Sequence, residues 1–234
     1  MNAGSKSPHG AERYPRKRGG LSLLVNEVYA SIQGEGPETG FPTVLVRLAG
    51  CNLRCSYCDS AYAFYKGERT EVPALVERIS SYGVARVLIT GGEPMAQAGT
   101  AALCRALVRR RLDVSIETNG SYLLGSLPRQ VVKVVDVKTP LSGAGGSFQM
   151  EVLASLARKD ALKFVVAGEK DYIWSRDFIL SNGLQKATSP QLFISPVWGK
   201  VALSDLAEWV LRDRLEARVQ VQLHKVIWGN RRGV

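Results

Sequence analysis

The chain has 234 residues, of which 45% are apolar and 22% charged, as in an ordinary globular protein with one full hydrophobic core. No apolar run approaches the roughly eighteen residues that a membrane-spanning helix needs, so we expect no membrane partner. The net charge of +10 by itself suggests a nucleic-acid-binding protein, but the distribution of that charge weakens this interpretation.

The basic residues are concentrated in two places. Residues 1–20 hold five Lys or Arg against one Glu in a Gly-, Pro- and Ser-rich stretch without apolar periodicity, which predicts a disordered basic leader. Arg109, Arg110 and Arg111 end a predicted helix, where cations complement the helix dipole. We therefore expect no direct nucleic-acid partner and a single domain over residues 21–234.

After the leader, apolar runs rich in Val, Leu and Ile alternate with amphipathic stretches, a pattern typical of a parallel sheet covered by helices. Strands are predicted over residues 23–29, 43–49, 84–90, 114–118, 131–137, 162–166, 192–195 and 219–223. Helices are predicted over residues 73–82, 100–111, 172–180 and 204–214. Pro73 suits a first helical turn, and Ser204 suits an N-cap. Since these helices are too few for eight βα units, we predict an α/β fold that forms an abbreviated, incomplete (βα) barrel with mostly parallel strands.

Candidate polar segments follow several of these strands directly. They lie at residues 51–58, 91–94, 117–120, 138–140 and 195–196. Because the carboxyl ends of barrel strands meet at one edge, where the active sites of such barrels lie, we expect these segments to form one site.

Cys51, Cys55 and Cys58 place three thiols within eight residues. A closed structural zinc site requires four ligands, whereas a cubane iron-sulfur cluster held by three thiolates keeps one iron open for a small molecule. A zinc knuckle completed by His224, His9 or Cys104 is the alternative. Zinc ligands usually come as two short pairs, and the chain has no second pair. Cys104 lies on the apolar face of a predicted helix, which favours a buried and inert thiol.

The Cys-x3-Cys-x2-Cys spacing resembles that of radical S-adenosylmethionine enzymes, and Thr90-Gly91-Gly92-Glu93-Pro94 strengthens the resemblance. The resemblance implies a [4Fe-4S] cluster whose open iron binds S-adenosylmethionine, and a fold of the radical S-adenosylmethionine type. It makes Gly92 the best match for the amino-group site, Glu93 an acceptor, and Tyr57 a neighbour of the adenine. The full set of implied cofactor contacts is Tyr57, Cys58, Asp59, Gly92, Glu93, Glu117, Lys138 and Ser195.

Further landmarks narrow the resemblance to the 7-carboxy-7-deazaguanine synthases. They are Ser31-Ile32-Gln33-Gly34-Glu35-Gly36, Arg47, Asp59-Ser60, Glu117-Thr118-Asn119-Gly120 and Gln222-Leu223-His224-Lys225. The family implies a carbon-nitrogen lyase of queuosine and 7-deazapurine biosynthesis. Its members convert 6-carboxy-5,6,7,8-tetrahydropterin into 7-carboxy-7-deazaguanine and ammonia, through hydrogen abstraction at C6 and a radical ring contraction.

The same resemblance implies the substrate contacts Ile32, Gln33, Gly34, Arg47, Thr90 and His224. Arg47 stands in an otherwise apolar strand and therefore needs an anionic partner, either the substrate carboxylate or a structural one. Ser60 stands where the family usually has a threonine that binds Mg²⁺, and it keeps the hydroxyl oxygen. His224 is placed in the last predicted strand.

Two alternatives remain open on the sequence. One is a glycyl-radical activating enzyme, against which the Ser31–Gly36 segment counts. The other is a zinc-stabilised nucleic-acid-binding module. With the main interpretation we expect a cytoplasmic protein, a flavodoxin or ferredoxin as electron donor, and a homodimer.

Overall fold

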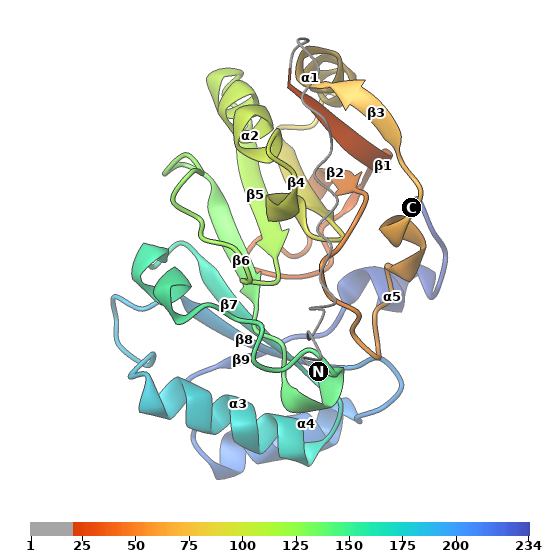
Figure 1. Ribbon diagram of the computed structural model, residues 1–234. Helices are drawn as coiled ribbons and strands as arrows, with labels where there is room; N and C mark the ends of the chain where they lie inside the picture. The colour runs from red at the N-terminus through yellow and green to blue at the C-terminus, as the bar shows by residue number, and fades with distance from the viewer. Residues whose placement is uncertain (1–20) are drawn as a thin grey trace, which may run out of the picture.

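A computed structural model describes residues 21–234, and the predicted disordered leader over residues 1–20 lies outside the described residues. Within that range, one nine-stranded sheet has the order β3-β1-β2-β4-β5-β6-β7-β8-β9 (Figure 1). Strand β1 is antiparallel to β2 and β3, and every pair from β2 to β9 is parallel. The strand bounds are β1 Ser22–Ile32, β2 Pro42–Leu48, β3 Glu68–Glu71, β4 Arg86–Gly91, β5 Asp113–Thr118, β6 Val132–Asp136, β7 Ala161–Val166, β8 Gln191–Pro196 and β9 Arg218–Val219.

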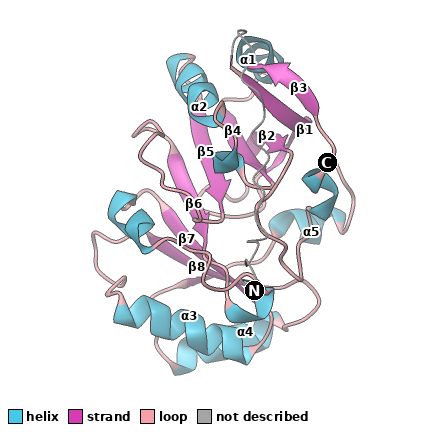
Figure 2. Cartoon of the chain, viewed as in Figure 1, coloured by secondary structure: helices cyan, strands magenta, loops and turns pink. Residues whose placement is uncertain are grey.

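The α-helices of residues 21–234 are α1 Val72–Ser80, α2 Thr100–Arg109, α3 Glu169–Ser181, α4 Leu203–Arg212 and α5 Leu223–Trp228. Helices α1 and α2 lie beside the first half of the sheet, and α3 and α4 cover its last strands (Figure 2). The edge strands β3 and β9 do not pair with each other, so the sheet stays open. The predicted incomplete barrel with mostly parallel strands is confirmed.

Successive side chains along a strand point alternately to the hydrophobic core and to a cavity on the opposite face of the sheet. In β4, Val87 and Ile89 join the core beneath the helices, while Leu88 and Thr90 face a cavity on the other side of the sheet. Strand β7 repeats this, with Phe164 in the core and Lys163 on the cavity side. This is the two-residue period of a strand, which sends successive side chains to opposite faces.

The end of the chain departs from the prediction. Only Arg218–Val219 is strand, so the predicted strand over residues 219–223 is wrong beyond Val219, and His224 lies on helix α5. The physical reason is a set of bonds that no local pattern encodes. Gln220 Oε1 accepts from the backbone N–H of Gly36 at 2.9 Å, and the Leu223 N–H donates to Gly34 O at 3.1 Å. These bonds draw the chain onto the loop after β1.

Smaller differences occur at the helices. Pro73 lies in the first turn of α1, as predicted, but α4 has Ala202 rather than Ser204 at its N-cap. The predicted N-cap is therefore one of the helical residues, and its hydroxyl donates to Asp205 Oδ1 at 3.2 Å. Strand β3 was not predicted, because its sequence Glu-Arg-Thr-Glu has no apolar alternation and pairs only along an edge. Within residues 21–234, no helix has the length and apolar character needed to cross a bilayer.

Candidate cofactor and substrate site

A cavity of about 620 Å³ opens at the carboxyl ends of the parallel strands. Its walls come from the cysteine loop after β2, the ends of β4, β5 and β6, and the segment that contains α5. This is the edge at which the sequence predicted the site. Residues that the sequence proposed and that line the cavity are Ile32, Gln33, Gly34, Arg47, Cys51, Cys55, Tyr57, Cys58, Asp59, Ser60, Thr90, Gly92, Glu117, Lys138 and His224.

The three cysteines of the loop are free, half-buried, and all in contact with the cavity. Burial raises the pKa of each thiol, and the Lys138 ammonium opposes that rise at all three. A single loop thus presents three sulfur ligands to an open space, which is the donor set of a cubane cluster with one free iron. Within residues 21–234, no three His, Cys, Asp or Glu side chains converge as the ligands of a single metal ion.

Cys104 is separate from this group. It is fully buried in α2 as part of the hydrophobic core, and burial raises the pKa of its thiol to about 12. The prediction of a buried, inert thiol fits this position.

Gly92 is required by a close approach between two loops. A Cβ at this residue would lie 1.9 Å from Gly50 O and 3.0 Å from the Cβ of Cys51. The Gly92 N–H donates to Leu48 O at 3.0 Å, and the next N–H donates to Gly50 O at 2.8 Å. The turn after β4 therefore packs directly on the start of the cysteine loop, and any side chain at Gly92 would push the two apart.

Glu93 and Ser195 do not reach the cavity, although the sequence proposed both as cofactor contacts. The Glu93 carboxylate is fully buried and accepts hydrogen bonds from Met95 N, Thr118 Oγ1 and Asn119 N at 2.7–2.8 Å. It therefore ties the turn after β4 to the turn after β5. Ser195 is buried in β8, and its hydroxyl has no hydrogen-bond partner among the residues that the structure describes. Val197, two residues later, lines the cavity in its place.

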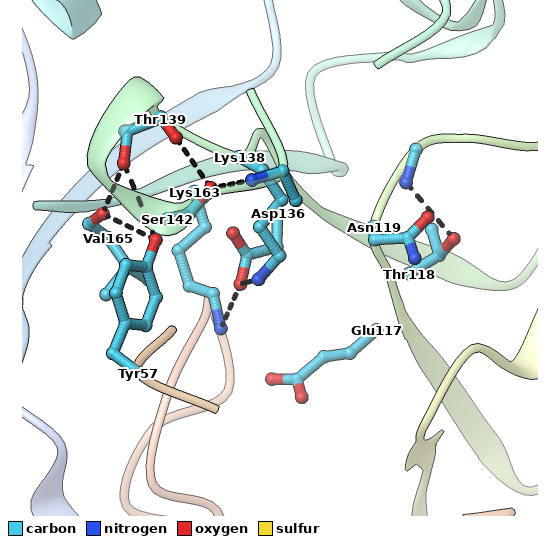
Figure 3. Close-up of polar contacts among 12 residues, drawn as sticks. Tyr57, Glu117, Thr118, Asn119, Asp136, Lys138, Thr139, Ser142, Lys163 and Val165 are labelled. Atoms are coloured by element: carbon cyan, nitrogen blue, oxygen red, sulfur yellow. Dashed lines mark hydrogen bonds and ion pairs between the residues drawn. The ribbon is translucent and has the colours of Figure 1, made fainter. Parts of the chain in front are cut away.

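Tyr57 and Lys138 both line the cavity at the cluster end, and Tyr57 points toward Thr139 and Val165 (Figure 3). The phenol donates to Val165 O at 3.1 Å, and burial raises the pKa of this phenol to about 12. The Lys138 ammonium lies 2.8 Å from Asp136 Oδ2. This end of the cavity therefore combines an aromatic ring, a fixed cation and the three thiols.

The other end of the cavity is formed by the loop after β1 and the start of α5. A Cβ at Gly34 would lie 1.9 Å from Nδ1 of His224, so the loop can approach the imidazole only as glycine. The amide of Gln33 donates to Glu35 O at 2.9 Å, but its Oε1 is buried and has no hydrogen-bond partner in the described part of the chain. An acceptor in that position is available to a ligand with N–H groups.

Arg47 already has an anionic partner within the protein. Its Nε lies 2.7 Å from Glu27 Oε1, while its two terminal nitrogens donate to Ser60 Oγ at 3.3 Å and Tyr29 Oη at 3.5 Å. The counter-ion that this strand arginine needs is therefore Glu27, a residue that the sequence did not indicate. The long bonds to Ser60 and Tyr29 leave the terminal nitrogens at the cavity wall for a second anion.

Several more cavity residues were not anticipated. They are Tyr29, Tyr62, Asp136 and Lys163; Glu35 and Gln222 also line the cavity, and they belong to the landmark segments Ser31–Gly36 and Gln222–Lys225 although the sequence assigned them no role. Lys163 had a visible signal, because a lysine in the apolar run Ala161–Val166 must find a buried counter-charge. Tyr29, Tyr62 and Asp136 lie in segments without a pattern that marks them.

The comparisons with known proteins agree with one another. The family model described as "Radical SAM superfamily" matches residues 45–138. The 7-carboxy-7-deazaguanine synthase of Koribacter versatilis is 41% identical over 222 residues, which cover 88% of this chain and 97% of the relative. That of Chlorobaculum tepidum is 37% identical, over 91% of this chain and 97% of the relative.

Solved structures show the same fold. The crystal structure of QueE from Escherichia coli has a TM-score of 0.70 at 23% identity, and covers 87% of this chain and 95% of that one. Streptococcus suis SuiB bound to S-adenosylmethionine has a TM-score of 0.50 at 17% identity, over 74% of this chain and 44% of that one. At these identities the two structures support the architecture of the open barrel.

Proposed function

The chain belongs to the 7-carboxy-7-deazaguanine synthases, radical S-adenosylmethionine enzymes of 7-deazapurine biosynthesis, and from this we propose that it converts 6-carboxy-5,6,7,8-tetrahydropterin into 7-carboxy-7-deazaguanine and ammonia. In the proposed reaction a hydrogen atom is removed from C6 and the ring then contracts. One observation carries the proposal: the three thiols and the glycine turn stand at one end of a cavity whose other end is a polar site closed by His224. Family membership replaces the glycyl-radical-activase and zinc-module interpretations.

A [4Fe-4S] cluster and S-adenosylmethionine belong to this family, and we assign their contacts to the cluster end. Cys51, Cys55 and Cys58 hold the cluster, and the residues around the glycine turn after β4, which contains Gly92, hold S-adenosylmethionine. When bound and reduced, the two supply a 5'-deoxyadenosyl radical. The remaining cofactor contacts are Tyr57, Asp59, Glu117 and Lys138, all on the cavity wall. Glu93 and Ser195 lie behind that wall and do not line the cavity. Glu93 contributes indirectly, by fixing the turns after β4 and β5 that we assign to the cofactor.

The substrate is assigned to the His224 end. Arg47 offers two terminal nitrogens to the substrate carboxylate, and Gln33 Oε1 accepts from a ring N–H. Ile32 and Gly34 contribute backbone groups, and His224 closes the site. Thr90 is oriented by its hydroxyl, which donates to Glu117 Oε2 at 2.9 Å.

Ser60 is our assignment for a Mg²⁺ ligand that helps to bind the substrate carboxylate. Its hydroxyl donates to Asp59 Oδ1 at 3.0 Å and accepts from Arg47. A hydroxyl and a carboxylate side by side are oxygen donors of the kind that Mg²⁺ prefers.

The remaining proposals concern surroundings and assembly. Residues 21–234 act as one catalytic domain, in the cytoplasm, where a flavodoxin or ferredoxin supplies electrons. The enzyme is a homodimer, which light scattering of the purified protein at several concentrations would test.

The deciding experiment reconstitutes the protein with iron and sulfide under anaerobic conditions. Dithionite, S-adenosylmethionine, Mg²⁺ and 6-carboxy-5,6,7,8-tetrahydropterin are then added, and 7-carboxy-7-deazaguanine is sought by mass spectrometry. Formation of product confirms the reaction. Release of 5'-deoxyadenosine without the deazaguanine would show radical chemistry on a different substrate.

A further inference from the structure

Four charged side chains of alternating sign form a row along the cavity floor. Lys163 Nζ lies 2.6 Å from Glu35 Oε2 and 3.6 Å from Asp136 Oδ2, and Lys138 Nζ lies 2.8 Å from the same Asp136 oxygen. Figure 3 shows Lys163 reaching across the cavity floor toward Asp136, with Glu117 pointing into the space beside its ammonium. The row joins the substrate end, at Glu35, to the cluster end, at Lys138.

Both carboxylates lie beside the Lys163 ammonium, and Asp136 also pairs with Lys138. The side chains of Lys163 and Glu35 are only 7% and 10% exposed, and that of Asp136 is 15% exposed. Glu35 has one further side-chain bond, from Gln222 Nε2 to its Oε1 at 2.6 Å. Asp136 Oδ1 is buried and finds no hydrogen-bond partner among residues 21–234. An acceptor left open in a cavity wall points to a ligand that donates to it.

Charges on every side act on Glu35. Lys163 from β7 and His224 from α5 favour its ionised form, whereas Asp59 from the cysteine loop opposes it. Burial raises the pKa of Glu35, and the adjacent ammonium outweighs burial so that this pKa is lowered. Burial lowers the pKa of Lys163, but Glu35, Glu117 and Asp136 raise it well above its usual value. Lys163 therefore stays a cation at every pH at which the enzyme works, which excludes it as a proton donor near neutrality.

We propose that Lys163 is a positioning residue, whose ammonium holds Glu35 at the substrate end and Asp136 at the cofactor end as ionised acceptors in fixed places. This inference rests on the proposed function, because it assigns the acceptor at Glu35 to N–H groups of the heterocyclic substrate. Neither Lys163 nor Glu35 was among the contacts that the sequence suggested. The role is electrostatic, since without Lys163 the Glu35 carboxylate would lose its paired cation, and Asp136 would keep only Lys138 in a confined space shared with Glu117.

Lys133 provides a matched control. It lies on the neighbouring strand β6, its side chain is 9% exposed, and its ammonium lies 2.9 Å from Asp160 Oδ2. It does not contact the cavity. Asp160 keeps bonds from the backbone N–H groups of Lys133 and Ala157 and from Lys159 when the Lys133 side chain is removed. Lys133→Met therefore tests the loss of a buried paired lysine without disturbing the row.

The first measurement is the affinity of the reconstituted proteins for 6-carboxy-5,6,7,8-tetrahydropterin between pH 5.5 and 8.5. For Lys163→Met we expect a loss of about tenfold or more, the scale of a broken buried charge pair, and a further fall relative to wild type as the pH drops. The further fall follows because the pKa of Glu35 rises without its counter-ion, so that Glu35 gains a proton and stops accepting. Lys133→Met should keep wild-type affinity and pH dependence. Lys163→Met with wild-type affinity and pH dependence would overturn the inference.

The second measurement is thermal unfolding of the chain without cluster. A carboxylate whose folded pKa is lowered stabilises the fold above its unfolded pKa, so the Glu35–Lys163 pair of the wild type stabilises more at pH 7 than at pH 4. In Lys163→Met the folded pKa of Glu35 is raised, so this contribution reverses and stability falls as the pH rises through that range. The unfolding temperature should therefore drop more at pH 7 than at pH 5. An equal drop at both pH values would argue against the electrostatic role.

The double variant Lys163→Met/Glu35→Gln distinguishes two roles of Lys163: holding an ionised acceptor in place for the substrate, and only neutralising a buried charge. Removing the orphaned carboxylate should restore the unfolding temperature at pH 7, while substrate affinity stays low because the ionised acceptor is gone. Full recovery of affinity in the double variant would overturn the inference. Wild-type protein that forms no product from the pterin would instead refute the proposed function, so the two failures are distinguishable.

Discussion

At the scale of single residues, the thiols divide into those that line the cavity, which we propose as cluster ligands, and one in the core. Cys51, Cys55 and Cys58 meet the cavity, whereas Cys104 is packed among the leucines of α2. Replacing any of the first three by alanine should abolish cluster assembly and S-adenosylmethionine cleavage, because a three-ligand site has no spare thiolate. Iron and sulfide content and 5'-deoxyadenosine release measure this.

Cys104→Ala is the control for that experiment. Removing a buried sulfur should cost about 1 kcal/mol of unfolding free energy through lost packing, with cluster content unchanged. Loss of the cluster in Cys104→Ala would contradict the three-ligand assignment.

Arg47 serves two partners, one in the protein and one in the proposed substrate. In Arg47→Ala, Glu27 keeps the hydrogen bond that Tyr62 Oη donates at 2.8 Å, so the carboxylate is not left without a partner. We expect cluster content to stay at the wild-type level and the KM for the pterin to rise about tenfold or more, since a charge-assisted pair contributes about 1.5–3 kcal/mol. Steady-state kinetics measure this, with Arg110→Ala, an exposed arginine paired with Glu77, as the control. An unchanged KM would return Arg47 to a purely structural role.

At the scale of elements, the loop after β1 and helix α5 act as one unit. Gly34 packs on His224 so closely that Gly34→Ala must displace the helix or the loop, since the new Cβ would lie 1.9 Å from the imidazole. We expect substrate affinity to fall by at least tenfold while the cysteine loop still assembles its cluster. Binding titrations together with the iron content measure this.

Gly125→Ala is the matched control, because a Cβ at that residue meets no atom within 4 Å. A Gly34→Ala variant with normal substrate affinity would show that the contact between loop and helix does not shape the site.

At the scale of the whole molecule, the open sheet carries buried carboxylates at both ends of its strands, Glu35 and Asp136 at the cavity and Asp160 directly before β7, and these set its response to acid. Burial raises the pKa of Glu35, Asp136 and Asp160, but each pKa ends below its usual value, because lysine ammonium groups outweigh burial at Glu35 and Asp136, and backbone N–H groups together with lysines do so at Asp160. Glu93 is the exception, because burial raises its pKa above the usual value.

Each lowered pKa stabilises the fold above the unfolded value, 4.5 for Glu35 and 3.8 for the two aspartates, and that contribution is lost as the pH falls through the folded value. Glu93 contributes in the opposite sense. Since the lowered groups outnumber it, the unfolding temperature of the cluster-free protein should fall steeply below about pH 4.5. Thermal unfolding from pH 7 to pH 3 measures this, and Asp160→Asn should flatten part of the fall. A constant unfolding temperature down to pH 3 would show that these ion pairs contribute no net stability.

The sequence by itself determined the features that depend on neighbouring residues. The spacing of Cys51, Cys55 and Cys58 put three thiols on one loop, and the end of the preceding strand put that loop at the cavity. Apolar runs located the strands of the open sheet to within a few residues, except the polar edge strand β3, because a strand buried on both faces reads as a continuous apolar run. The predicted site edge followed from the parallel direction of those strands.

Tertiary structure alone decided the contacts between distant residues. Lys163 and Glu35 are 128 positions apart, and only the curvature of the sheet brings them to 2.6 Å. The same holds for Glu27 beside Arg47 and for the bonds that turn the predicted last strand into α5. Glu93 matched a cofactor motif, yet its carboxylate turns inward, where it accepts from the Thr118 hydroxyl and the Asn119 N–H at the end of β5. Periodicity describes which face a residue occupies, whereas the partner it meets there depends on how the whole sheet closes around the cavity.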